Sequence, residues 1–267
     1  MGPPVSLTIA GSDSGGGAGI QADLRTFAAL GVFGTSVVTA VTAQNTAEVR
    51  GVEVVRTDFV DLQLDTVLAD MAVASVKTGM LASSATVAAV GRRAAGGELP
   101  NLVVDPVLVA STGRPLLDDD GPSTYLHTLF PHALVVTPNT REAALLTGIA
   151  VHSTADMARA AARLADTGAR VVVVKGGHLA GDDAPDVVLA DGELHTLAAG
   201  RVPTANDHGT GCTLSAAIAA FVATGEAPLE AVARAKEFVT RALAGSARWR
   251  LGAGRGPVDH FGWGDRG

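Results

Sequence analysis

Short runs of β-branched residues recur along the chain and alternate with longer segments of helical character. Six such runs occupy residues 5–10, 35–43, 74–80, 101–107, 133–139 and 169–177. Successive positions in them are apolar, which is typical of strands buried on both faces of a parallel sheet. The pattern therefore predicts six buried strands with helices between them.

Two of the intervening segments also carry signals for helix ends. Residues 21–30 place their large apolar residues on one face and stop before Gly31, a residue suited to the position after a helix. Ser153 precedes a second segment and is followed three positions later by Asp156, as in a capping box, and Gly168 closes it. Both segments are predicted to be helices.

Strand and helix in repeated alternation predict right-handed βαβ units. We expect an α/β fold with a mostly parallel, doubly wound sheet and helices on both faces. The chain of 267 residues shows no linker, fixed-period repeat or low-complexity tail. Residues 1–267 are therefore predicted to form a single domain.

The charge and the terminal sequence restrict the partners. The formal net charge is −7 and the arginines are scattered, which argues against nucleic acid and anionic membranes and favours a small-molecule partner. One cysteine excludes an intrachain disulfide, and the first residues lack the basic start and apolar core of a signal peptide. No apolar run reaches the roughly 18 residues of a membrane span. A cytoplasmic location is expected.

The glycine-rich segment GSDSGGGAG, residues 11–19, follows the first predicted strand. It lacks the Lys-Ser/Thr ending of a P-loop, and no acidic residue follows at the distance that a dinucleotide ribose requires. Asp13 would also repel phosphate. The segment is predicted to bring its backbone close to a ligand other than phosphate; a flexible strand-to-helix turn is the alternative.

A second glycine motif begins a predicted helix with Gly209, Thr210, Gly211 and Cys212. Backbone N–H groups at a helix start suit an anion, so we place the transferring phosphoryl group here. Cys212 lies in the first turn, where a helix N-terminus would lower the pKa of a thiol. A buried, unreactive cysteine is the alternative.

Polar residues follow several predicted strands at their carboxyl ends, where ligands bind in such sheets. Asp105 and Glu142 are suited to a hydrated Mg²⁺, Asn139 lies near Glu142 in sequence, and Lys175 is placed to face phosphates. Each also has an ordinary interpretation. Asp105-Pro106 is typical of a turn, Asn139 with Glu142 of a helix cap, and Lys175 of an exposed lysine.

Gln44 ends a predicted strand, and its carboxamide matches the acceptor and amino donor of an aminopyrimidine edge. Asp23, in the first turns of the helix after residues 11–19, would accept from the same ring or its hydroxymethyl group. The alternatives are an amide that caps backbone and a solvated surface aspartate. His178 and His208 lack a third ligand for a metal and are expected to be structural, hydrogen-bonded histidines.

The segments GSDSGGGAGIQADL, VTAQNT, VKTGMLAS, VVDPV, VTPNTREA, VVKGGH, DHGTGCTLSAAIAA and GRGPVDHF occur in order over nearly the full chain. Together they resemble the hydroxymethylpyrimidine and hydroxymethylpyrimidine-phosphate kinases of thiamine biosynthesis, within the ribokinase-like family. The resemblance implies a three-layer sandwich, a homodimer, and transfer of phosphoryl groups from ATP, with Mg²⁺, to 4-amino-5-hydroxymethyl-2-methylpyrimidine and then to its monophosphate.

The resemblance also implies roles for individual residues. The pyrimidine contacts are Gly11, Asp23, Val41, Gln44, Met80 and Val107. The anion hole is formed by Gly209, Thr210 and Gly211, with Cys212 as the base that takes the hydroxyl proton. Mg²⁺ and the nucleotide phosphates are bound, by the same resemblance, by Asp105, Asn139, Glu142 and Lys175.

Two positions depart from the family pattern. Asp207 stands where the family often has threonine, and residues 111–113 are Ser-Thr-Gly where it often has Lys-Ser-Gly. An added carboxylate and a lost cation would both weaken binding of a phosphorylated substrate, so the second phosphorylation is the less secure expectation. The alternatives are a pyridoxal or pyridoxine kinase on the same fold, a non-catalytic ligand-binding relative, and, more weakly, a dinucleotide-dependent oxidoreductase.

Overall fold

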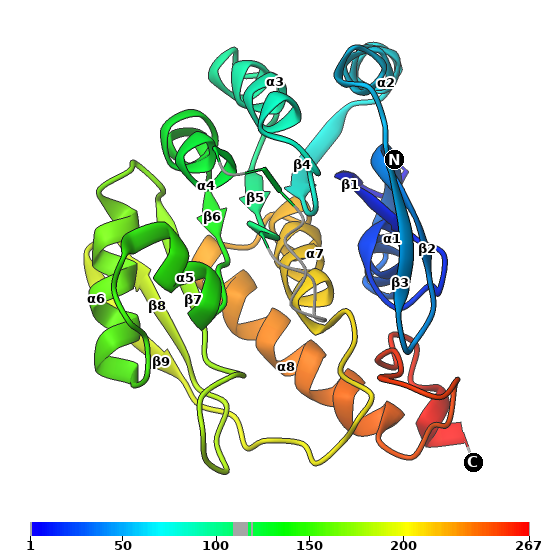
Figure 1. The fold of residues 1–267 in the computed structure, drawn as a ribbon, viewed down its shortest axis with the longest axis vertical. Coiled ribbons are helices and arrows are strands. Elements are labelled where there is room, and N and C mark those ends of the chain that lie inside the picture. The colour runs from blue at the N-terminus through cyan, green and yellow to red at the C-terminus, as the bar shows by residue number, and fades with distance from the viewer. Residues whose placement is uncertain (1, 109–116, 119, 267) are drawn as a thin grey trace.

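A single nine-stranded sheet forms the centre of the molecule (Figure 1). The computed structural model describes residues 2–108, 117–118 and 120–266. In chain order the strands are β1 (Val5–Asp13), β2 (Phe33–Gln44), β3 (Val49–Val54), β4 (Val73–Thr78), β5 (Leu102–Val104), β6 (Val135–Val136), β7 (Val171–Lys175), β8 (Asp186–Ala190) and β9 (Glu193–Leu197). In space they follow the order β3-β2-β1-β4-β5-β6-β7-β8-β9.

The central strands are parallel and the outer strands antiparallel. Parallel pairing runs without interruption from β2 through β7, whereas β3, β8 and β9 pair antiparallel. The six predicted strands are all present, and the sequence analysis missed the three antiparallel ones. Those strands lie toward the edges, and the outermost, β3 and β9, have mixed or exposed positions instead of the continuous apolar run that identifies a central strand.

Helices cover both faces of the sheet, so the predicted three-layer sandwich is confirmed. The helices are α1 (Gly19–Ala29), α2 (Thr57–Asp70), α3 (Ser84–Ala95), α4 (Gly121–Thr124), α5 (Thr140–Thr147), α6 (Thr154–Ala165), α7 (Thr210–Ala223) and α8 (Pro228–Ser246). One apolar core lies between the sheet and α2, α3, α5 and α6, and the other between the sheet and α1, α7 and α8.

Local signals set the helix ends as the sequence predicts. Gly31, just after α1, has φ +76°, a conformation that glycine adopts without strain. The hydroxyl of Ser153 accepts from the backbone N–H of Asp156 at the start of α6. The carboxylate of Asp156 accepts from His152 N, one residue before the cap, so the capping box is displaced by one position.

The direction of winding reverses at β1. The chain passes from β1 to β2 on one side, and after α2 it crosses to β4 on the other side. Ligands bind in open α/β sheets at such a reversal, outside the carboxyl ends of the strands. The segment after α8 returns to this region beside the β2–β3 connection, where Gly254 N donates to Thr46 (Figure 1). No helix within the described residues is long and apolar enough to cross a membrane.

Candidate active site

The predicted site residues line up along the carboxyl edge of the sheet in strand order. Gln44 ends β2, Gly11 lies near the end of β1, Met80 follows β4, Asp105 and Val107 follow β5, Asn139 follows β6, and Lys175 ends β7. Except for Val107, which follows β5 beside Asp105, the predicted pyrimidine contacts on the sheet edge gather at the β2, β1 and β4 end of this row, and the predicted phosphate ligands lie at the β5, β6 and β7 end. Helix α7, whose N-cap is Gly209 and whose first residues are Thr210, Gly211 and Cys212, packs against the middle of the row, on β1, β4 and β5.

The first glycine-rich segment is organised by its own aspartate. The carboxylate of Asp13 accepts from the backbone N–H groups of Gly15, Gly17 and Ala18, at 2.8, 3.1 and 2.9 Å. Burial pushes the pKa of Asp13 up, but these bonds and the one from His208 outweigh it and hold the pKa below its usual value. N–H groups that serve Asp13 are not free for a phosphate, which supports the prediction that this loop binds something else.

The two glycine motifs are in direct contact. Gly209, the N-cap residue of α7, has φ +82°, and a Cβ there would collide with the carbonyl oxygen of Gly17. A Cβ on Gly17 would in turn collide with the ring of His208. Glycine is needed at both positions, because the Gly17 backbone leaves no room for a side chain at residue 209 and the His208 ring leaves none at residue 17. The N–H groups of the first turn of α7 have no partners within the helix, as a binding site for an anion requires, although Thr210 N donates to Asp207 O at 3.3 Å in this structure.

The remaining predicted pyrimidine contacts lie at or beside the β2, β1 and β4 end of this row. Met80 lies over Gly11 so closely that a Cβ there would collide with the methyl group of Met80. Val41 is half exposed on β2, and Val107 and Gln44 are partly exposed. The structure brings these residues to one region, and their contacts with a substrate stay predictions.

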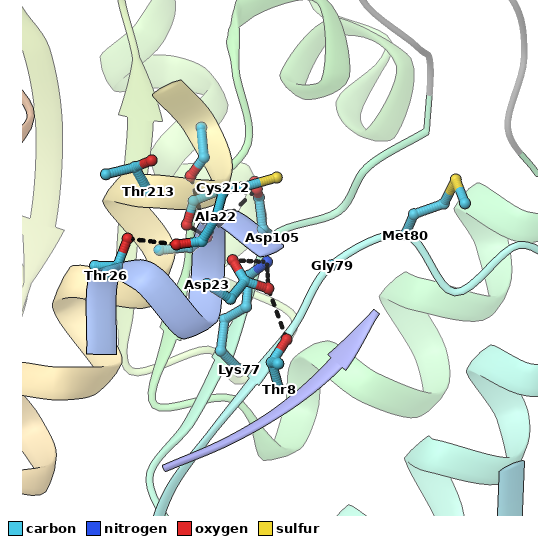
Figure 2. A network of polar contacts seen from close by, with 12 residues as sticks. Thr8, Ala22, Asp23, Thr26, Lys77, Gly79, Met80, Asp105, Cys212 and Thr213 are labelled. Carbon is cyan, nitrogen blue, oxygen red and sulfur yellow. Dashed lines mark hydrogen bonds and ion pairs between the residues drawn. The ribbon is translucent and has the colours of Figure 1, made fainter. Parts of the chain in front are cut away.

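Asp23 is not the surface residue that a substrate contact or a solvated aspartate would be. Its side chain is 0% exposed and lies between Lys77 of β4 and Thr8 of β1 (Figure 2). The ammonium group of Lys77 is 2.9 and 2.8 Å from the two carboxylate oxygens, and the Thr8 hydroxyl donates at 2.6 Å. Burial alone would lower the pKa of Lys77, but Asp23 holds it above its usual value. The expected direct pyrimidine contact is therefore corrected: Asp23 is the counter-ion of a buried lysine.

Cys212 also differs from expectation. Burial, with smaller contributions from Asp23 and Asp105, raises the pKa of its thiol to about 11, and Lys77 and a backbone hydrogen bond from Gly19 only partly oppose this rise. The sequence analysis expected the helix N-terminus to lower this pKa. Desolvation and two nearby carboxylates outweigh the helix dipole, so the thiol is protonated at neutral pH in this structure.

Asp105 and Lys175 form an ion pair at the phosphate end. Lys175 Nζ lies 2.7 Å from Asp105 Oδ1, which also accepts from the hydroxyl of Thr137 at 3.1 Å. Ser215 of α7 donates to Asp105 Oδ2 at 3.4 Å. Lys175 is mostly buried, so the exposed-lysine alternative is wrong. A Cβ on Gly211 would lie 3.2 Å from Lys175 Nζ, which places this charge against the start of α7.

Asn139 and Glu142 form the helix cap that the sequence analysis weighed as their ordinary interpretation. Asn139 Oδ1 accepts from Arg141 N and Glu142 N, and Glu142 Oε2 accepts from Asn139 N at 2.7 Å. Burial, with a smaller contribution from Asp105, raises the pKa of Glu142 to about 7 against the opposing effect of Lys175. Glu142 thus caps α5 while facing the charges of Asp105 and Lys175.

This donor set fits a Mg²⁺ ion. Mg²⁺ is usually held by one or two carboxylates together with phosphates and water. Burial of the Glu142 carboxylate, and to a lesser extent the charge of Asp105, raises the pKa of Glu142 in spite of Lys175, so a cation here would stabilise the ionised carboxylate. Among the described residues no group of three or more His, Cys, Asp or Glu forms a site made of protein ligands alone.

Two features were not recognised in the sequence. Lys77 is the one charged residue of the largely buried strand β4, and a lone charge in a buried strand is a signal that identifies it. Asp207, expected to add negative charge near the anion hole, is paired through both oxygens with Arg255 at 2.6 Å. The second departure from the family pattern, at residues 111–113, lies outside the described residues.

Comparison with known proteins gives consistent matches over nearly the whole chain. A family model described as phosphomethylpyrimidine kinase matches residues 13–259. The hydroxymethylpyrimidine/phosphomethylpyrimidine kinase of Rhizobium meliloti is 52% identical over 260 residues, covering 96% of this chain and 97% of the relative. The pyridoxal kinase of Bacillus subtilis, solved as an ADP complex, has a TM-score of 0.88 at 36% identity over 97% of both chains. The phosphomethylpyrimidine kinase of Clostridium difficile has a TM-score of 0.80 at 38% identity, covering 90% of this chain and 99% of that one.

Proposed function

Because the chain belongs to the phosphomethylpyrimidine kinase family, we propose that it phosphorylates 4-amino-5-hydroxymethyl-2-methylpyrimidine and then its monophosphate, with ATP as the donor. The fold is that of the ribokinase-like kinases. The observation that carries the proposal is the order of residues along the sheet edge. Acceptor positions at β2, β1 and β4, with Val107 after β5, and phosphate ligands at β5, β6 and β7 follow one another along this edge, and α7 packs on β1, β4 and β5 in its middle.

The anion hole is the centre of the proposed transfer. Backbone N–H groups of Gly209, Thr210 and Gly211 would stabilise the charge on the transferring phosphoryl group. Lys175 lies against Gly211, so its positive charge reaches the same position. Asp105, Asn139 and Glu142 would hold Mg²⁺ and the nucleotide phosphates, and Mg²⁺, when bound, would neutralise part of the phosphate charge.

On the acceptor side, we assign Gln44 to the aminopyrimidine edge and Gly11, Val41, Met80 and Val107 to the walls around the ring. Asp23 is buried and makes no direct contact with the ring in this proposal; its role is to pair with the ammonium group of Lys77. Cys212 remains our candidate for receiving the hydroxyl proton. Its thiol is protonated in the free protein, so this role requires that the thiol ionise once the substrates are bound.

A pyridoxal kinase is the second candidate, and one observation favours it. The structural match to the pyridoxal kinase of Bacillus subtilis has the higher TM-score, 0.88 against 0.80 for the phosphomethylpyrimidine kinase of Clostridium difficile. The curated relative with 52% identity supports the pyrimidine. Gln44 supports it too, since a carboxamide pairs with an aminopyrimidine edge.

The test is a mass-spectrometric time course with ATP and Mg²⁺, in which the hydroxymethylpyrimidine and pyridoxal are supplied in parallel. We expect the pyrimidine monophosphate first and the diphosphate afterwards. Faster turnover of pyridoxal would overturn the proposal in favour of the second candidate, and no transfer to either would favour a binding protein.

A variant of Gln44 tests its assigned contact with the ring. Gln44→Leu keeps the side-chain volume but removes the amide, so it is expected to raise KM for the pyrimidine and leave KM for ATP unchanged.

We also propose that the whole chain forms one domain, that it works as a homodimer, and that it acts in the cytoplasm. The two continuous cores on either side of a single sheet support the first point. Sedimentation of the purified protein tests the second.

A further inference from the structure

His208 lies where three parts of the candidate site meet. It precedes Gly209 at the start of α7, its ring packs against Gly17 of the first glycine-rich segment, and it faces Gln44 at the end of β2. Its Nε2 atom is 2.9 Å from Asp13 Oδ2 and 3.1 Å from the side-chain nitrogen of Gln44. The side chain is only 14% exposed. The histidine is hydrogen-bonded as the sequence analysis expected, but its partners belong to the site.

The two contacts at Nε2 determine which atom carries the proton. One ring nitrogen cannot donate to Asp13 and also accept from the amide of Gln44. Asp13 accepts three backbone N–H groups and is a carboxylate, so a lone pair on Nε2 would face negative charge. The N–H group is therefore on Nε2 and points to Asp13. An amide NH₂ group against that N–H would place two donors together, so we assign the oxygen of Gln44 to the side of His208, where it shares the Nε2–H with Asp13. The NH₂ group of Gln44 is then the donor left for a ligand.

The same hydrogen bond fixes the relative position of the two glycine motifs. Asp13 holds the first segment through Gly15, Gly17 and Ala18, and His208 holds Asp13 from the α7 side. The backbone N–H of His208 donates to Gly256 O at 3.0 Å, so the histidine is itself anchored. A change at His208 Nε2 is therefore transmitted both to the acceptor loop and to Gln44.

We propose that His208 is a positioning residue for the acceptor: through Nε2 it locks the glycine-rich segment at residues 11–19 against the anion hole and sets the orientation of the Gln44 amide. The inference rests on the proposed kinase function and adds a specificity role to it. The ligand chemistry it orients is a planar ring with a nitrogen lone pair at its edge, because a fixed amide NH₂ group donates to such an atom; a ring amino group beside that nitrogen, as in the pyrimidine, would donate to the second lone pair of the Gln44 oxygen.

Two substitutions separate the hydrogen bond from the bulk of the ring. His208→Gln places an amide NH₂ group near the position of Nε2, whereas His208→Asn reaches only to that of Nδ1. We expect His208→Asn to raise KM for the pyrimidine about tenfold or more, since a charge-assisted bond is lost. KM for ATP should stay within about twofold. His208→Gln should restore KM for the pyrimidine to within about threefold of the unmodified protein.

A double-mutant cycle with Asp13→Asn supplies the second measurement. If His208 acts through Asp13, the double variant should be no worse in KM for the pyrimidine than the more affected single variant. Additive losses would overturn the inference, as would equal losses in His208→Gln and His208→Asn, or an equal rise in KM for ATP. All variants are compared for thermal unfolding, so that a general loss of folding is recognised.

The failure of the proposed function is distinguishable from the failure of this inference. If the unmodified protein phosphorylates pyridoxal and not the pyrimidine, the proposed substrate is wrong, and the same KM comparisons are made with pyridoxal. Recovery in His208→Gln but not in His208→Asn would then still support the positioning role. If the pyrimidine is phosphorylated and His208→Asn has the KM of the unmodified protein, the function stands and the inference fails.

Discussion

The raised pKa of Cys212 leads to a prediction that a single titration tests. The rise from the ordinary 9.0 to about 11 means that the site favours the thiol over the thiolate by about 3 kcal/mol. At pH 8 the thiolate fraction is then about 0.1%, against roughly 10% for an unperturbed thiol. Alkylation of the folded protein should therefore be about a hundredfold slower than that of an exposed thiol at the same pH, even before access is considered.

The assay benefits from the composition of the chain. The sequence contains one cysteine, so carboxamidomethylation by iodoacetamide, followed by mass spectrometry between pH 7 and pH 11.5, reports on Cys212 alone. The inflection with pH is the measured quantity because slow access lowers the rate without moving the inflection. The same protein in guanidinium chloride is the control and should titrate near 9.0.

An inflection at or below 9 in the folded protein would refute the argument that burial and the carboxylates of Asp23 and Asp105 outweigh Lys77 and the helix start.

The role of the thiol in the reaction is tested separately, by measuring kcat of Cys212→Ala. If the thiol takes the hydroxyl proton, kcat should fall by about a hundredfold or more. A loss below tenfold would reject Cys212 as the base, which a loose transition state does not strictly require.

Three further predictions concern charges around the site. Burial lowers the pKa of His260 from 6.5 to about 4, so the folded protein should lose stability as pH falls from 6.5 to 4, by about 3 kcal/mol. Urea unfolding should show this slope in the unmodified protein and not in His260→Gln. Lys77→Met should cost about 3–5 kcal/mol because it leaves Asp23 buried and unpaired, and Lys77→Met with Asp23→Leu should recover most of it in the same assay. Arg255→Ala should raise KM for the pyrimidine monophosphate about threefold by freeing Asp207, with little change for the unphosphorylated substrate; adding Asp207→Asn should reverse it.

The strands and their order of appearance were predictable because a strand buried on both faces leaves a continuous apolar run, and a polar residue that ends such a run lies at the carboxyl edge. This logic located Asp105 and Lys175 correctly at one edge. It failed for the antiparallel strands β3, β8 and β9, whose positions depend on pairing with neighbours. Register and pairing are properties of the sheet and not of a single segment.

The sequence by itself identified the candidates for the chemistry: the two glycine motifs, the carboxylates, Gln44 and Cys212. Only the tertiary structure decided their states. It paired Asp23 with Lys77, kept the thiol of Cys212 protonated, and joined Asp13 to His208 across 195 positions of the chain. The physical reason is that charge state depends on desolvation and on charges a few ångströms away. Those neighbours are brought together by the fold and are not adjacent in the sequence.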